Sequence, residues 1–337
     1  MCVKRDRNRA LALCFVASLS PLGRLLPGSA LRSSGSWAFL VTVLALPVSW
    51  ALGGAAGRVC SRRGGKMPPA LALPLALWLC FYAGVISRAA AERLCQAVYP
   101  ETKPYIFIIV IALAVLVTLR GRQVSLYRAA RLVLPFLASA MAFIFLFNLA
   151  KVSPGWLLPR EEFSPGVLWG LVPVIAPSGL WLAEAALRGD GEEVRRPGLR
   201  SLLTAALGCA MTLLTVGALS PGMAAQVRDP AMTLVRDMEV LGSDTRVDAL
   251  AVAVWIVTDF AALALLAALA RRALSLALPR LRGPGPDLFC ALGPMAVGCL
   301  FAGAPEFALG PAPLINAGVC YVYLPLGVLF GGKNEET

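Results

Sequence analysis

The 337-residue sequence has no histidine and few charges: 15% of its residues are charged, against about 25% in a typical soluble domain. Histidine is the usual general base near neutral pH and the commonest metal ligand, so its absence argues against hydrolytic catalysis and most metal sites. No pair of carboxylates at helical spacing offers a substitute. We therefore predict that the protein is not an enzyme, with no catalytic residue, no metal and no cofactor.

Paired cysteines at metal-binding or redox spacing are also missing. The nine cysteines include no C-x-x-C pair, and most lie within apolar runs, so they indicate small buried hydrophobes and not a disulfide framework or a zinc site. The net charge of +12 would suggest nucleic acid only on a soluble fold with a basic face. Here the basic residues lie between apolar segments, and no nucleic-acid partner is expected.

Apolar residues are abundant, at 58% of the chain. A membrane-spanning helix needs roughly 20 largely apolar residues. The sequence has ten such candidates, of which the fourth and ninth are short, and it predicts a single polytopic, all-α integral membrane domain in contact with the lipid bilayer. The candidates are 10–30, 36–56, 68–88, 104–119, 132–150, 164–186, 200–220, 247–270, 287–304 and 311–330.

Basic clusters alternate with these segments. Lys and Arg are concentrated at 4–9, 58–66, 120–131, 188–200 and 271–282, always on the same side if the ten segments cross in turn. Cytoplasmic loops are enriched in these residues. We therefore predict a multi-pass cell membrane protein with both termini in the cytoplasm, with Arg62 on that side and Asp237 on the other.

An even count of ten divides into two halves of five, about 10–150 and 164–330, and an odd number per half permits an inverted repeat. Helix-breaking patterns recur in the first and sixth segments, where transporters of this kind bind solutes between unwound helix ends. An ordinary proline kink is the alternative for each pattern. The candidate ligand-binding residues are Ser18, Ser20, Pro21, Gly23, Pro177, Ser178 and Gly179.

Unwound helix ends at membrane depth expose free N–H and C=O groups, which need polar partners. The carboxylate of an amino acid suits the N–H groups and its ammonium suits the carbonyls, so a small nutrient, in particular an amino acid, is the expected ligand.

Asp259 lies inside the eighth segment, where a carboxylate is costly to insert. Two hypotheses remain open: a coupling-ion or ligand-amine site, or a structural acid that stays protonated or pairs with a residue such as Arg24. Three other polar residues, Asn148, Glu184 and Asn316, lie near segment ends, where solvation at the membrane interface would explain them.

Several stretches resemble the spore germination permease family, the GerAB-like B subunit of nutrient germinant receptors, within the amino acid, polyamine and organocation transporter superfamily. The resemblance is carried mainly by TLLTVGALSPGMAAQVRDPAMTLVRDMEV (212–240) and DTRVDALAVAVWIVTDF (244–260). It is supported upstream by YPETKP (99–104) and ARLVLPF (130–136).

This resemblance implies a leucine-transporter-like fold with a 5+5 inverted repeat and broken helices 1 and 6. It implies a subunit that binds a nutrient and signals spore germination in the spore inner membrane, together with a membrane A-type subunit and a C-type lipoprotein. The residues around Gly179 depart from the family pattern, so the ligand does not transfer. A secondary amino acid or amine transporter is the alternative, because both functions use the same fold.

Overall fold

The fold was analysed in a computed structural model of the chain. It describes residues 2–60, 67–97, 101–121, 123–188, 196–227, 229–236, 247–281 and 283–331. Within these ranges the secondary structure is helical, with no strand. The all-α prediction is therefore confirmed.

The helices follow the predicted segments in order. The first half forms α1 (Cys2–Ser34), α2 (Ala38–Cys60), α3 (Pro69–Ala97), α4 (Pro104–Arg120) and α5 (Gln123–Leu149). The second half forms α6 (Leu171–Ile175) with α7 (Gly179–Arg188), α8 (Pro197–Leu219), α11 (Val247–Ala277), α12 (Gly285–Leu300) and α14 (Pro311–Gly318) with α15 (Leu324–Gly331). Short helices α9 (Pro221–Gln226), α10 (Pro230–Arg236) and α13 (Ala304–Leu309) lie between them.

Length and composition support ten crossings. Within the described residues, 7 helical stretches are long and apolar enough to span a membrane. Shorter apolar helices cover the predicted first, fourth and ninth segments, at Ala12–Leu22, Pro104–Arg120 and Gly285–Leu300. The protein is therefore a multi-pass membrane protein.

The two predicted breaks differ. α1 is helical from Cys2 to Ser34 with Pro21 inside it, so residues 18–23 form a proline-containing helical stretch and not the unwound segment we expected. A proline removes only one hydrogen bond of the helix, and inside a membrane the remaining backbone groups are best satisfied by staying helical. In the sixth segment, a tighter 3-10 turn at Ala176–Ser178 separates α6 from α7.

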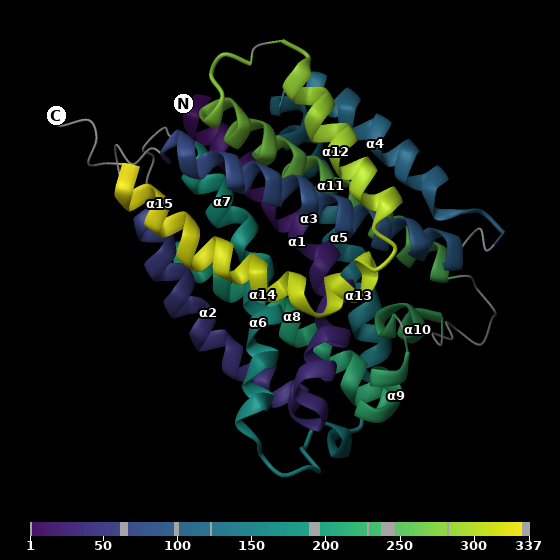
Figure 1. Ribbon diagram of the computed structural model, residues 1–337. Coiled ribbons are helices and arrows are strands. Elements are labelled where there is room, and N and C mark those ends of the chain that lie inside the picture. The colour runs from purple at the N-terminus through teal and green to yellow at the C-terminus, as the bar shows by residue number, and fades with distance from the viewer. Residues whose placement is uncertain are drawn as a thin grey trace.

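Helix packing arranges the segments in two groups around α1. In one group, α2 packs extensively on α8. In the other group, α3 packs on α11 and α12, and α4 packs on α12. The central helix α1 contacts α8 of the first group, α11 of the second group, and α5. In Figure 1, α15 ends on the side of the molecule where α1 begins, and α9 and α10 lie at the opposite end. The predicted repeat boundaries, 10–150 and 164–330, stay predictions.

Glycines on α2 allow its close approach to α8. A Cβ atom on Gly54 would lie 3.7 Å from the Cα atom of Gly198, and one on Gly57 would lie 2.9 Å from the Trp181 ring. Helices in lipid gain stability from such close packing, since no hydrophobic effect drives them together. The contact fixes α2, α7 and α8 as one packed unit.

Candidate functional site

The 3-10 turn of the sixth segment lies against α1. The buried Ser18 hydroxyl donates to the carbonyl of Cys14 at 2.8 Å and lies 3.4 Å from the carbonyl oxygen of Pro177. These two helices are 159 residues apart in sequence at this contact. The structure thus brings together Ser18 and Pro177, one from each predicted break.

The tenth segment supplies hydrogen bonds to the turn. Ser178 donates to the Ile175 carbonyl at 2.7 Å, and the Tyr321 hydroxyl approaches the same oxygen at 3.2 Å. Ser178 and Tyr321 also contact each other through their hydroxyls, and the Asn316 amide donates to the Ala176 carbonyl at 3.1 Å. Side chains therefore satisfy carbonyls that an irregular helix leaves free, as a membrane interior requires.

Gly179 is the point where the sixth and tenth segments come closest. A Cβ atom built on Gly179 would clash with the Cys320 sulfur and lie 2.5 Å from the Cys320 Cβ atom. A larger side chain at position 179 would therefore displace the tenth segment and not simply fill a ligand space. Pro21 is buried within α1, whereas the surroundings of Gly23 lie outside the described part of the structure.

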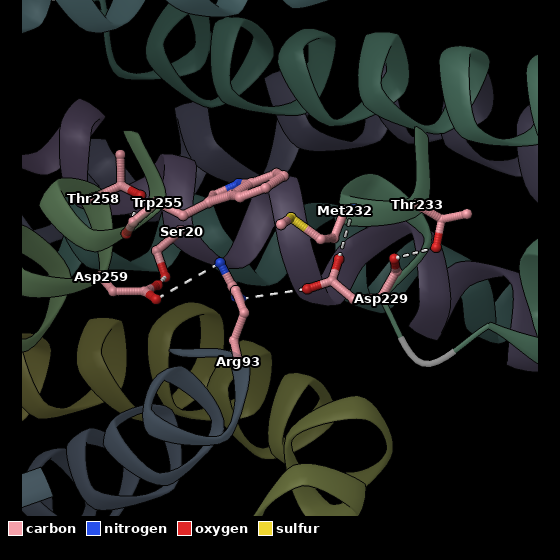
Figure 2. A network of polar contacts seen from close by, with 8 residues as sticks. All are labelled: Ser20, Arg93, Asp229, Met232, Thr233, Trp255, Thr258 and Asp259. Atoms are coloured by element: carbon pink, nitrogen blue, oxygen red, sulfur yellow. Dashed lines mark hydrogen bonds and ion pairs between the residues drawn. The ribbon is translucent and has the colours of Figure 1, made fainter. Parts of the chain in front are cut away.

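Ser20 does not face this turn, because its hydroxyl donates to Asp259 on α11 (Figure 2). The other Asp259 oxygen lies 3.7 Å from a guanidinium nitrogen of Arg93 on α3. Asp259 is 5% exposed and Arg93 is 7% exposed. Among the described side chains, Asp259 forms an ion pair with Arg93; Arg24, which the sequence suggested, lies outside the described side chains, and that pairing stays a prediction.

Arg93 connects the membrane interior to α10. Its Nε lies 3.3 Å from an Asp229 oxygen, and its guanidinium lies 5.4 Å from the centre of the Trp255 ring. Asp229 also accepts from the Met232 amide at 3.1 Å, at the start of α10 (Figure 2). None of the three guanidinium nitrogens has a hydrogen-bond partner in the described part of the structure. A cavity of about 210 Å³ adjoins Arg93, Trp255 and Asp259.

A second buried polar cluster joins α5, α7 and α11. Arg272 donates to Glu184 at 2.8 Å and to the Tyr127 hydroxyl at 2.6 Å. Tyr127 in turn donates to the second Glu184 oxygen at 3.2 Å.

Interfacial solvation is the wrong explanation for the three weaker candidates. Asn148, Glu184 and Asn316 are all buried, with exposed fractions of 0%, 6% and 3%. These side chains are enclosed by the helix bundle. Glu184 pairs with Arg272, and the Asn148 amide donates to the Ile144 carbonyl of its own helix at 2.9 Å.

Arg93 was missed because the predicted third segment stopped at residue 88. The helix continues to Ala97. Arg88 and Glu92 pair one turn apart at 2.7 Å, and this Arg-x-x-x-Glu spacing was the signal for a helix that continues past the first charge.

No group of three or more His, Cys, Asp or Glu side chains in the described residues is placed to hold a metal ion. The polar side chains around Asp259 are the Ser20 hydroxyl, the Asp229 carboxylate and the Arg93 guanidinium. Such an arrangement can bind a small polar solute, or it can bind a proton or cation at the Asp259 carboxylate.

The sequence matches no protein-family model, and no curated protein is significantly similar to it. Solved structures do share its fold. One is Mhp1, a nucleobase-cation-symport-1 family transporter in a closed conformation with bromovinylhydantoin bound, with a TM-score of 0.57 and 14% identity over 93% of this chain and 76% of that chain. Another is the Eremococcus coleocola manganese transporter, with a TM-score of 0.48 and 17% identity over 95% of this chain and 77% of that chain. The chain has the leucine-transporter-like fold that it shares with Mhp1.

Proposed function

We propose that the protein is a secondary transporter of a small polar solute, an amino acid or amine, which binds between α1 and the turn of the sixth segment. The sequence predicts ligand-binding roles for Ser18, Ser20, Pro21, Gly23, Pro177, Ser178 and Gly179; of these, Ser18 contacts Pro177 in this region, while Ser20 contacts Asp259. The observation that carries the proposal is the buried link from Ser20 through Asp259 to Arg93. Charges at membrane depth that are paired inside a bundle mark ion and substrate pathways.

Asp259 is the coupling acid in this proposal. Protonation or cation binding at Asp259 weakens its attraction to Arg93 and changes its bond to Ser20, and so changes how α1 sits against α3 and α11. The solved neighbour Mhp1 is a nucleobase-cation-symport-1 family transporter. If a cation binds at Asp259 in this chain, it shifts the equilibrium between two helix arrangements. The size of that shift equals the difference between the cation's affinities for the two arrangements.

A second candidate function is that of a germinant-receptor subunit, which the resemblance of 212–240 and 244–260 favours. The same site would then bind a nutrient and signal to an A-type membrane subunit and a C-type lipoprotein in the spore inner membrane, with both termini cytoplasmic. Transport through the membrane is not needed for that role.

Uptake by the full-length protein in vesicles tests both functions. Proteoliposomes would receive a mixture of labelled amino acids and amines under an inward proton or sodium gradient. We expect accumulation by the wild type, loss of gradient-driven accumulation in Asp259→Asn, and no change in Glu306→Gln, an exposed control. Binding without uptake under either gradient would favour the receptor. Neither binding nor uptake of any of these solutes would overturn the proposed solute class.

A further inference from the structure

A second cavity, of about 360 Å³, lies between α1, α5, α7 and α8. Its wall includes Phe15 and Ser18 on α1, Trp181 on α7 and Leu203 on α8, and it is mostly apolar. The Trp181 indole N–H is buried and has no partner in the described residues. The cavity is separate from the one beside Arg93 and touches the proposed solute region only at Ser18.

The neighbouring surface shows which part of the cavity wall lies near lipid. Leu203, a wall residue, is 55% exposed, and Leu132, which directly follows the wall residue Arg131 on α5, is 79% exposed. Exposed leucines on spanning helices face hydrocarbon, so this part of the wall, between α5 and α8, reaches the lipid-facing surface. An apolar wall reached from lipid suits an acyl chain.

Two guanidinium groups, Arg131 on α5 and Arg200 on α8, complete the wall. They come from two different basic clusters, 120–131 and 188–200, and share the wall with Ala12 and Cys14 in the first half of α1. Arginine binds phosphate oxygens in a bidentate manner, and basic pockets between spanning helices hold anionic lipid headgroups.

We propose that this cavity binds an anionic phospholipid from the leaflet on the basic side of the protein. The headgroup phosphate lies with Arg131 and Arg200, and an acyl chain covers the apolar wall beside Leu203. A carboxylate-bearing solute would also attract two arginines. The lipid-facing part of the wall and its apolar lining favour the lipid, since a solute pathway must reach water.

Native mass spectrometry of the full-length protein in detergent tests this site. The protein would be titrated with an equimolar mixture of phosphatidylglycerol and phosphatidylcholine. We expect the wild type to retain phosphatidylglycerol preferentially. The double variant Arg131→Gln/Arg200→Gln should lower this affinity by about 30-fold and leave phosphatidylcholine unchanged. Thr204→Phe, which fills the cavity without changing charge, should lower the affinity for phosphatidylglycerol as well.

The matched control is Arg58→Gln/Arg280→Gln, which removes two exposed arginines outside the cavity and should leave the preference intact. An equal loss of phosphatidylglycerol affinity in this control would show that the lipid is attracted to basic surface in general, and it would overturn the proposed site. No preference in the wild type would also overturn it. Displacement of phosphatidylglycerol by a soluble amino acid mixture, but not by sodium chloride, would reassign the cavity to a solute.

Discussion

Arg93 on α3 faces Asp259 on α11 across 3.7 Å, and none of its guanidinium nitrogens makes a hydrogen bond within the described residues. Both side chains are almost fully buried, and Asp229 is the only other acid recorded in an ion pair with Arg93 there. A buried ion pair contributes little net stability, because desolvation offsets the attraction, but removing one partner is expensive. The pair therefore suits a part of the protein whose charge state changes during function.

Replacing Asp259 with Leu should destabilise the protein by about 3 to 5 kcal/mol, because Arg93 then keeps only the more exposed Asp229 as a partner. The double variant Arg93→Met/Asp259→Leu should recover much of this loss. Thermal unfolding in detergent, followed by fluorescence, measures both effects. Equal stability of wild type and Asp259→Leu would remove the acid from the folded network.

Replacing Gly179 with Ala should destabilise the protein by about 1 to 3 kcal/mol through overpacking against Cys320. Cys320→Gly should relieve the crowding, so the double variant should be more stable than the sum of the two single changes. The same unfolding measurement gives the coupling. Strict additivity would mean that the sixth and tenth segments are not in contact here.

Replacing Arg272 with Met removes the cation that pairs with the buried Glu184 carboxylate, at an expected cost of about 3 to 5 kcal/mol. The exposed pair of Arg32 and Glu306, 2.6 Å apart, is the natural control. Arg32→Met should cost about 1 kcal/mol or less, because solvent screens that pair. Similar losses in both variants would contradict the buried cluster.

Much of the fold was readable from the sequence because hydrophobic length and charge alternation are local signals. The first segment was harder to predict, since Pro21 removes one hydrogen bond but does not by itself end a helix that is packed on all sides. At the site, Ser20 and Asp259 were each identified, yet nothing in their spacing showed that they bond to each other. Arg93 was not predicted, because it lies beyond residue 88, where we expected the third segment to end. Tyr321 was not singled out, because its position opposite the turn depends on how the tenth segment packs.

The alternation of basic clusters also predicts topology. Positions 62 and 237 lie outside the described residues, so Lys103 and Arg120, at the two ends of α4, are better markers. In a variant lacking the nine native cysteines, Lys103→Cys should react with an impermeant maleimide from the outside, and Arg120→Cys only after permeabilisation. Labelling of both from one side would refute the ten-crossing arrangement.

α4 and α12 pack on each other, and they have 17 and 16 residues. At about 1.5 Å per residue each is about 25 Å long, shorter than the ~30 Å hydrocarbon layer. The two helices therefore create a hydrophobic mismatch on one flank, where lipid must thin to meet them. We expect the activity of the protein to be highest in bilayers of lipids with short or unsaturated chains. Membrane thickness would then control how α4 and α12 sit in the bilayer.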